Sequence, residues 1–339
     1  MHIHIINKIV FGGAETIAVK LSKKFGDSVV VSLSTKNFLE FQKRFSVKVR
    51  SLNYLFISLI KNKNLKIFTH SLHSHVIVNT IGMISKIFLY KKFKFHNVIH
   101  FDSYFANKIW LYLFIISIRL LKPEIIFVSN FAKVRFNDFY SLKGINVKII
   151  NNSIDDIFFK KKYKYLKRIK SKKIYIGFIG RNKSIKRIPL FLEICYELSK
   201  IDRKYNFIMQ SDITKEEILD LINNLSLKKG FFNLDKNFTI IPSDHNPLKF
   251  YDKCDIVIST SKTESFGLVC IESLAMGKRF YSVNSESLEM LIGENDINIK
   301  NEDPKFISKF LNEEISKTYI IPNISKFREE NMINEYYKI

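Results

Sequence analysis

The segment DIVISTSKTESFGLVCIESLAMG, residues 255–277, decides the fold of this chain. Asp255–Ser259 is apolar and rich in β-branched residues, which predicts a buried strand. A polar loop follows, and the apolar spacing of Phe266–Met276 predicts a helix that starts directly after it. A strand that leads through a loop into a helix is the repeating step of a parallel α/β sheet. The amides of such a helix start have no intrahelical partner and can hold a ligand above the strand ends.

Two carboxylates lie eight residues apart in this segment. Glu264 lies in the loop and Glu272 lies two turns into the helix, so we expect both to face one pocket. Carboxylate oxygens accept hydrogen bonds from hydroxyl groups, which suits a neutral polyol. We expect Gly267 to let the ligand approach the backbone. Two solvated acids at an ordinary helix start are the alternative, but the adjoining Phe-Gly-Leu and Ala-Met-Gly favour a site.

The rest of the chain repeats the alternation of short strands and amphipathic helices, which predicts parallel sheets covered by helices. The predicted strands are His2–Ile6, Ser28–Ser32, Val47–Leu52, Ile67–His70, Phe95–His100, Ile125–Val128, Val147–Ile150, Ile174–Ile179, Asn206–Gln210, Phe238–Ile241, Asp255–Ser259 and Arg279–Val283. The predicted helices include Ala14–Lys24, Val76–Tyr90, Arg187–Lys200, Thr214–Asn224 and a last helix over Ile324–Ile339.

The length of 339 residues suits two domains. The segment Lys160–Lys173 carries nine Lys or Arg and no acid, which predicts a solvated linker between them. The formal net charge is +23, and residues 1–170 hold 30 Lys and Arg against 8 Asp and Glu, or +22 of it. Such a one-sided positive field attracts an anionic partner, either a lipid surface or a nucleic acid. We favour a lipid surface.

The three cysteines lack metal-ligand spacing and indicate free thiols in a reducing compartment. The start of the sequence reads as a strand rather than a signal peptide, and no apolar run is long enough to span a bilayer. The apolar helix Ala106–Leu121 is either a core helix or a face that dips into a bilayer between Lys108, Arg119 and Lys122.

The segment Thr263–Gly277 resembles the E-x7-E signature of retaining glycosyltransferases of the GT-B fold, specifically glycosyltransferase family 4. The resemblance covers most of the chain. Further matches are Phe11-Gly12-Gly13-Ala14-Glu15, Val128-Ser129, Ile149–Asp155, Ile176–Arg181 with Lys186, and Glu289. The chain departs from the family pattern at Ser265, Asn151–Ser153 and Ser285-Glu286, so the motifs do not identify the donor.

This resemblance implies an α/β fold of two Rossmann-like, doubly wound parallel-sheet domains that face a central cleft. The first domain, residues 1–160 with the C-terminal helix 322–339, would bind the acceptor and face a membrane. The second domain, residues 161–321, would bind the nucleotide sugar. Ligands in such sheets lie beyond the carboxyl ends of the strands.

The resemblance also implies roles for residues at these strand ends. They are ribose binding by Glu272; donor-sugar binding by Glu264, Ser265, Phe266, Gly267 and Leu268; diphosphate binding by Arg181, Lys186 and Gly13; and a catalytic contact with the sugar by His100 and Glu264. His73 and Asp102 are alternatives to His100. Lys183 and Arg187 lie close enough to be confused with the diphosphate pair, and all four cations could instead be surface residues of a Lys-rich chain.

We expect no metal or other cofactor. The clustered histidines lack a His-x3-His helix and a cysteine or carboxylate partner at ligand spacing. The expected activity is transfer of a hexose-type sugar, with retention, from a nucleotide diphosphate-sugar to a lipid-linked glycan acceptor. The setting would be bacterial surface polysaccharide synthesis (lipopolysaccharide, O-antigen or capsule), on the inner face of the cytoplasmic membrane. A GT-B nucleotide-sugar epimerase and a basic nucleic-acid-binding protein are the alternatives, but no recognisable nucleic-acid-binding module is present.

Overall fold

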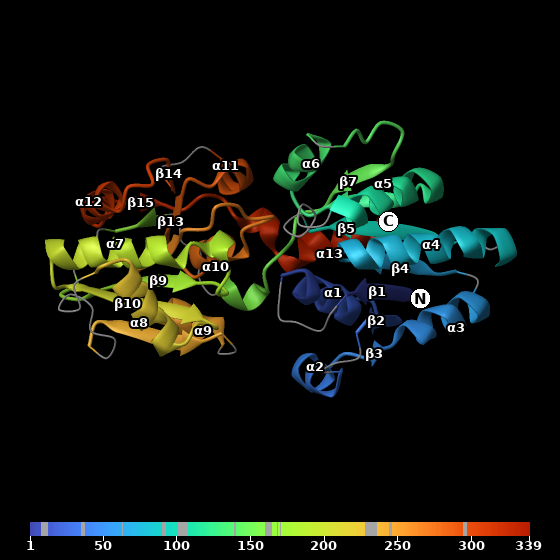
Figure 1. The fold of residues 1–339 in the computed structure, drawn as a ribbon, viewed down its shortest axis with the longest axis horizontal. Coiled ribbons are helices and arrows are strands. Elements are labelled where there is room, and N and C mark those ends of the chain that lie inside the picture. The colour runs from blue at the N-terminus through green and yellow to red at the C-terminus, as the bar shows by residue number, and fades with distance from the viewer. Residues whose placement is uncertain are drawn as a thin grey trace. The chain divides into compact units, whose positions relative to one another are not determined.

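The computed structural model divides the chain into two compact units (Figure 1). It describes residues 1–7, 13–34, 38–62, 64–89, 93–100, 108–138, 140–159, 165–167, 169, 171–227, 236–243, 246–293 and 297–339. Unit 1 contains Met1–Ser153 and Glu330–Ile339, and unit 2 contains Ile154–Glu329.

Unit 1 is built on a seven-stranded sheet in the order β3-β2-β1-β4-β5-β6-β7, in which every neighbouring pair is parallel. Its strands are β1 (His2–Ile6), β2 (Ser28–Ser32), β3 (Val49–Arg50), β4 (Lys66–Thr69), β5 (Lys94–Ile99), β6 (Glu124–Phe127) and β7 (Val147–Ile149). The strand order reverses between β1 and β4, which is the position where doubly wound sheets bind their ligands.

The helices of unit 1 are α1 (Gly13–Lys24), α2 (Phe38–Phe45), α3 (Leu52–Lys61), α4 (Leu72–Leu89), α5 (Lys108–Leu121), α6 (Asn130–Asn137) and α13 (Glu329–Tyr337). They cover both faces of the sheet. One core cluster joins Leu55 of α3, Val78 of α4 and Leu121 of α5 to the strands. The opposite face packs on α1 and α2 through Ala18 and Phe41. Successive side chains of each strand point to opposite faces and so pack into these two cores in turn, as expected for a sheet buried on both faces.

Unit 2 contains a six-stranded parallel sheet in the order β11-β10-β9-β12-β13-β14. Its strands are β9 (Ile174–Ile179), β10 (Tyr205–Ser211), β11 (Phe238–Pro242), β12 (Ile256–Ser259), β13 (Arg279–Val283) and β14 (Asn298–Ile299). Its helices are α7 (Ile188–Ile201), α8 (Lys215–Asn224), α9 (Pro247–Lys253), α10 (Leu268–Ala275), α11 (Glu286–Ile292) and α12 (Pro304–Glu314). Here the order reverses between β9 and β12.

Local sequence explains several helix starts in unit 2. Thr214 and Glu217 form a reciprocal capping box at α8, so two backbone N–H groups that lack helical partners are satisfied. Asp303 caps α12 and is followed by Pro304, whose fixed φ suits the first helical position. The predicted two-domain alternation of strands and helices is confirmed.

Two sequence-based expectations are corrected. The predicted single helix over 324–339 is instead a short 3-10 turn, Ser325–Phe327, followed by α13. Arg328 between them is extended, because it bridges Ile154, pairs with Asp156 at 3.1 Å and lies over the Phe159 ring.

The predicted solvated linker is also partly structured. Within 160–173, β8 (Tyr165–Leu166) pairs antiparallel with β15 (Tyr319–Ile320), and the N–H of Ile169 donates to the carbonyl of Ile315 at 2.9 Å. Residues 160–164, 168 and 170 of this segment lie outside the described residues.

The apolar helix α5 packs in the core of unit 1 along one side and is exposed along the other. Leu111, Phe114 and Ile118 are buried against the sheet, whereas Ile109 and Leu120 are 72% and 65% exposed. Across the described residues, no helix is both long and apolar enough to cross a bilayer.

Candidate active site

The candidate site in unit 2 lies where β9 and β12 end, at the point where the strand order reverses. The segment 180–187 follows β9, and the segment 260–267 follows β12. These two loops contain most of the residues that the sequence singled out in this half of the chain. Ligands of doubly wound sheets bind at this position.

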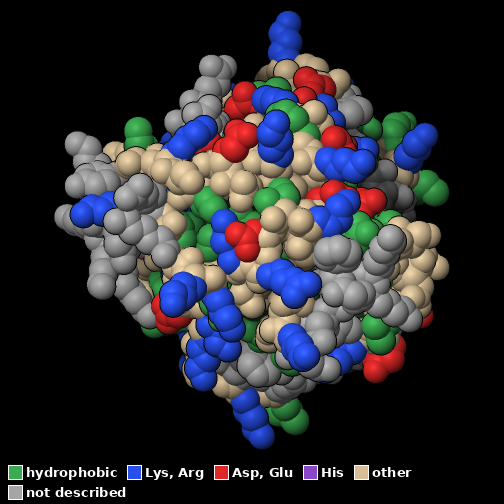
Figure 2. All heavy atoms as spheres, turned by 90° about the vertical axis from the view of Figure 1, so that its left-hand side faces the viewer, with side chains coloured by type: hydrophobic (Ala, Val, Ile, Leu, Met, Phe, Trp, Pro, Cys, Tyr) green, Lys and Arg blue, Asp and Glu red, His purple; other side chains and the backbone are tan. Residues whose placement is uncertain are grey.

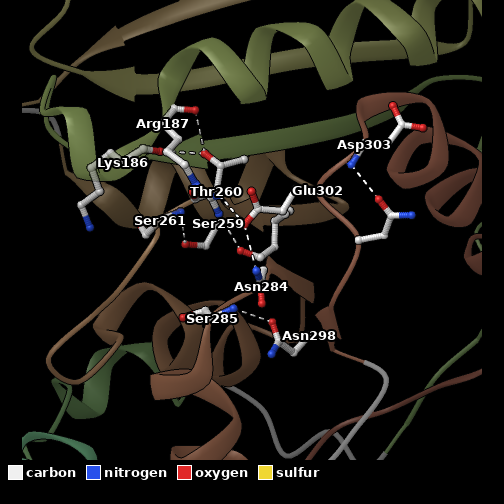
Figure 3. A network of polar contacts seen from close by, with 12 residues as sticks. Lys186, Arg187, Ser259, Thr260, Ser261, Asn284, Ser285, Asn298, Glu302 and Asp303 are labelled. Carbon is white, nitrogen blue, oxygen red and sulfur yellow. Dashed lines mark hydrogen bonds and ion pairs between the residues drawn. The ribbon is translucent and has the colours of Figure 1, made fainter. Parts of the chain in front are cut away.

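Arg187 holds the two loops together (Figure 3). Its backbone is left-handed, with φ of 50°, and its side chain crosses to the ends of the neighbouring strands. Nη2 donates to the carbonyl of Val283 at 2.7 Å, Nη1 pairs with Glu302 at 2.8 Å, and Nε donates to the carbonyl of Thr260. Arg187 therefore stabilises the loop and is not available as the main phosphate ligand.

Lys186, its neighbour, points elsewhere. Its Nζ lies 2.6 Å from Oε1 of Glu264, and both side chains are largely buried, with 19% and 15% exposed. The carbonyl of Lys186 accepts a hydrogen bond from the Thr260 hydroxyl at 2.7 Å, which fixes the lysine over the end of β12. The structure thus brings together one cation and one carboxylate that the sequence predicted for the same ligand.

Arg181 lies directly after Gly180 and is exposed, as is Lys183. Among the described residues, neither side chain makes an ion pair. Arg181 lies just beyond the carboxyl end of β9. The planar guanidinium group of arginine presents several N–H donors, which suits phosphate oxygens.

The loop that carries Glu264 is fixed at its backbone. The N–H of Glu264 donates to the hydroxyl of Ser287 at 3.2 Å, and this hydroxyl lies 3.1 Å from that of Ser285. The adjacent Ser265 and Leu268 are partly buried, and Leu268 begins α10. The first N–H groups of α10 have no acceptor within the helix, so they can face a ligand.

The structure gives a reason for Gly267 that the sequence did not. Its φ is +83°, and a Cβ built on it would lie 2.1 Å from Cδ2 of Leu288. A left-handed turn and the packing of α11 therefore require glycine here, and the approach of a ligand stays a prediction. The side chain of Phe266 is also buried, edge-on to Phe327, so it can offer a ligand only its backbone.

Glu272 lies on α10, and its carboxylate is oriented by a residue that the sequence did not single out. The Tyr251 hydroxyl donates to Oε2 of Glu272 at 2.6 Å. Burial raises the pKa of Tyr251, and the nearby Glu272 carboxylate raises it further, so the phenol stays protonated. Tyr251 comes from α9, and no sequence motif connects it to Glu272.

Glu289, which the family resemblance also pointed to, lies on α11. Its Oε2 accepts from Asn298 at 3.2 Å and from the ammonium of Lys300. These bonds lower the pKa of Glu289, so the carboxylate is ionised.

Histidines form a chain in unit 1 near the reversal point of its sheet. His4 on β1 contacts His70 through Nδ1 and Nε2 at 3.2 Å, and His70 contacts Nε2 of His100 at 3.4 Å. Burial lowers the pKa of His4 and of His100 to about 3 and lowers that of His70. All three rings are therefore neutral near pH 7.

The hydrogen bonds between these three histidines have a preferred donor-to-acceptor direction. Nε2 of His4 is buried without a hydrogen-bond partner. An unpaired acceptor there costs less than an unpaired N–H, so the favoured arrangement has His4 donating to His70 and His70 donating to His100. His100 then accepts through Nε2 and carries its own proton on Nδ1.

Other predicted residues of unit 1 are only partly described. Gly13 begins α1 and is exposed, whereas Gly12 and Asp102 lie outside the described residues. The ring of His73 lies against Trp110, with centroids 4.4 Å apart. Within the described ranges, no three His, Cys, Asp or Glu side chains gather closely enough to hold a metal ion, and the three cysteines are buried free thiols.

This chain is similar to known sugar transferases. The family model described as "Glycosyl transferases group 1" matches residues 159–326. A curated relative from Campylobacter jejuni is named N-acetylgalactosamine-N,N'-diacetylbacillosaminyl-diphospho-undecaprenol 4-alpha-N-acetylgalactosaminyltransferase. It is 30% identical over 163 residues, which are 47% of this chain and 41% of the relative. The chain thus matches less than half of that relative's length.

Solved structures match nearly the whole chain. Anabaena Alr3699/HepE in complex with UDP-glucose has a TM-score of 0.74 at 13% identity, covering 99% of this chain and 98% of that one. A glycosyltransferase from Rickettsia africae has a TM-score of 0.70 at 17% identity, covering 99% and 96%. The lipopolysaccharide outer core galactosyltransferase WaaB, in its apo form, has a TM-score of 0.69 at 13% identity, covering 100% and 98%. The expected GT-B fold is confirmed.

Proposed function

We propose that this protein is a retaining glycosyltransferase, a reading that the match of residues 159–326 to the glycosyl transferases group 1 model supports. It moves a hexose-type sugar from a nucleoside diphosphate-sugar to a lipid-linked glycan acceptor. The observation that carries the proposal is the Lys186–Glu264 pair above the end of β12, with Glu272 on the adjoining helix α10. These residues supply a cation for a diphosphate and carboxylates for sugar hydroxyls in one place.

The donor binds to unit 2 in this proposal. Glu272, oriented by Tyr251, accepts hydrogen bonds from the ribose hydroxyls. Glu264 and the amides at residues 265–268 bind the donor sugar. Arg181 and Lys186 hold the diphosphate, which adds a second anionic partner for the Lys186 ammonium and stabilises the charge that grows on the leaving phosphate.

Unit 1 contributes His100 and the start of α1 at Gly13. The neutral ring of His100, held by His70, presents Nδ1–H as a hydrogen-bond donor to a sugar hydroxyl. A neutral donor suits this role because a charged imidazolium would oppose the positive charge that develops on the sugar ring. Gly13 offers the diphosphate an approach to the amides at the start of α1.

The reaction proceeds with retention through an oxocarbenium-like state. The bond between the anomeric carbon and the phosphate oxygen breaks, and the acceptor oxygen attacks from the same face. The departing phosphate takes the acceptor's proton, so no protein nucleophile is needed. We propose that cationic side chains, rather than a metal, neutralise the diphosphate.

The acceptor assignment rests on the relatives. The Campylobacter relative is named for a diphospho-undecaprenol substrate, and WaaB is named for lipopolysaccharide outer core. A lipid-linked acceptor fits the basic first half of the chain, which would rest on the inner face of the cytoplasmic membrane as a peripheral protein. Surface polysaccharide synthesis, as for lipopolysaccharide, O-antigen or capsule, is the proposed setting.

Donor hydrolysis tests this function. Purified protein is incubated with UDP-, GDP- and ADP-sugars, with and without a chelator, and released nucleoside diphosphate is measured. Release from one donor that survives chelation and disappears in Glu272→Ala supports a metal-independent transferase. Where no donor is cleaved alone, membrane extract supplies the acceptor, and no release under either condition contradicts the proposal. A sugar product epimerised at C2 without acceptor would identify an epimerase instead.

A further inference from the structure

Three helices of unit 1 form one outer layer with an unusual surface. The layer consists of α3, α4 and α5, whose inner sides share one core against the sheet. Their outer sides carry the exposed large apolar residues Phe56, Ile57, Ile60, Ile84, Ile87, Ile109, Tyr112, Leu113, Ile116 and Leu120. On α5 these positions follow helical spacing, so they make a continuous stripe opposite the buried stripe.

This layer contains no acidic residue. Between residues 41 and 123 the chain has 14 Lys and Arg and a single acid, Asp102, which lies outside the described residues. Lys61 ends α3, Lys108 begins α5, and Arg119 lies in its last turn. All three cations are exposed. Among the described residues of these three helices, the charged groups beside the apolar stripe are therefore all cations.

The outer helices of unit 2 show that this pattern is not simply the composition of the chain. Helix α8 carries Lys215 with Glu216, Glu217 and Asp220, and α12 combines Lys305 and Lys309 with two glutamates. Figure 2, which views the left-hand side of Figure 1, shows acidic side chains beside basic ones over that surface. A mixed surface of this kind is typical of a face that remains in water.

We propose that the α3–α4–α5 layer docks onto an anionic phospholipid bilayer, with its apolar side chains at the level of the head groups. Apolar contact together with cations and the absence of acids is the pattern of interfacial membrane-binding helices. A second copy of the chain would need charge complementarity, and an acid-free face repels its own copy. The inference deepens the proposed function, because a lipid-linked acceptor lies in a bilayer, although the surface evidence does not depend on it.

A pocket at the rim of the layer supports the same partner. It has a volume of about 420 Å³ at the amino ends of β5 and β6 and is lined by five lysines: Lys86, Lys94, Lys122, Lys148 and Lys338. Lys86 belongs to α4, and Lys122 directly follows α5. Lys148 is paired with Glu124 at 3.1 Å and Lys338 is paired with Glu335, whereas Lys86 and Lys94 donate to backbone oxygens of Leu121 and Ile339. Lys122 makes no ion pair with a described residue, so its ammonium group suits the phosphate of a lipid head group.

Vesicle binding by the full chain tests the proposal. We expect cosedimentation with phosphatidylglycerol-containing vesicles, much weaker binding to pure phosphatidylcholine, and a loss of binding as salt rises. The variant Ile109→Gln/Leu113→Gln/Leu120→Gln removes apolar contact with the bilayer. Its affinity for the vesicles should fall by roughly tenfold or more. Its matched control, Ile201→Gln/Phe306→Gln/Ile320→Gln, changes three exposed apolar residues of unit 2 and should bind as wild type.

A second pair of variants tests the role of the cations by removing three positive charges from either unit. Lys61→Gln/Lys108→Gln/Arg119→Gln should weaken binding to anionic vesicles by roughly tenfold. Lys253→Gln/Lys305→Gln/Lys309→Gln in unit 2 should not. Equal losses in the two variants would mean that only net charge matters and would overturn the docking face.

Two further outcomes would also overturn it. One is equal binding of wild type to neutral and anionic vesicles, or binding to neither. The other is a dimer by light scattering that the Ile109→Gln/Leu113→Gln/Leu120→Gln variant converts to a monomer. Donor hydrolysis in solution separates the two proposals. The layer variants should keep it, so lost vesicle binding with intact hydrolysis concerns the face alone, whereas absent hydrolysis in wild type concerns the function.

Discussion

The two units place their charges at opposite positions. Unit 2 concentrates charged groups at the carboxyl ends of its central strands, where Lys186 pairs with Glu264, and mixes both signs on its outer helices. Unit 1 has neutral histidines near the corresponding edge of its sheet and carries cations on an outer apolar layer. On the outer layer of unit 1 the cations are thus not matched by acids, whereas at the candidate active site Lys186 is matched by Glu264. Each prediction below tests one side of this contrast.

The largest effect is expected at Lys186. Replacing it with alanine removes the cation paired with Glu264, so donor cleavage should fall by roughly 10² to 10³, as for the loss of one charge-stabilising group in an active site. Lys183→Ala, an exposed lysine three residues away on the same loop, should retain activity. The measurement is the rate of nucleoside diphosphate release. Equal losses in both variants would show that the loop needs general positive charge rather than this side chain.

Glu272→Ala should have the second-largest effect. It removes the carboxylate that accepts the hydrogen bond of the buried Tyr251 hydroxyl. Loss of charged hydrogen bonds to ribose should weaken nucleoside diphosphate binding by roughly 100-fold in titration calorimetry. Glu313→Ala, an exposed acid on α12, is the matched control. Unchanged affinity in Glu272→Ala would remove this residue from the site.

Acid should destabilise unit 1 before unit 2. His4 and His100 have folded-state pKa values of about 3, far below the ordinary value, so only the unfolded state binds their protons between about pH 6.5 and 3. Folding stability is thus fully present above pH 6.5 and falls as the pH drops, by up to about 1.4 kcal/mol per pH unit for each such histidine.

Seven of the eight histidines lie in unit 1, so the measurement is thermal unfolding from pH 7 to 5, followed by tryptophan fluorescence from Trp110. His4→Phe should reduce the acid sensitivity, because a ring stacked on Phe68 is kept and the titrating group is removed. An acid sensitivity equal to that of wild type would mean that the buried histidine chain does not control it.

Tyr251→Phe should have the smallest effect. The ring stays packed, and the 2.6 Å hydrogen bond that orients Glu272 is lost. We expect a loss of nucleotide affinity of roughly fivefold to tenfold, in line with a hydrogen bond to a charged group. Tyr175→Phe, a part-buried tyrosine on β9, is the control. A loss as large as that of Glu272→Ala would assign Tyr251 a direct contact with the ligand.

The order of elements was readable because the local signals are strong. Strands such as Ile174–Ile179 and Arg279–Val283 are as predicted, since buried parallel strands are short apolar runs bounded by turns. The last helix was misread because its periodicity continues through Arg328. Contacts with Ile154, Asp156 and Phe159, far away in the sequence, hold that residue extended.

The sequence by itself determined the fold class and the strand ends at which the candidate residues lie, because strand and helix periodicities and loop chemistry are local. Tertiary structure alone decided what the neighbouring cations do. Lys186 and Arg187 are indistinguishable in a Lys-rich sequence, yet one faces Glu264, whereas the other binds carbonyls of Thr260 and Val283. It also showed that Leu288 requires Gly267 and that Tyr251 orients Glu272. Such contacts join residues far apart along the chain, so they follow from packing rather than from local pattern.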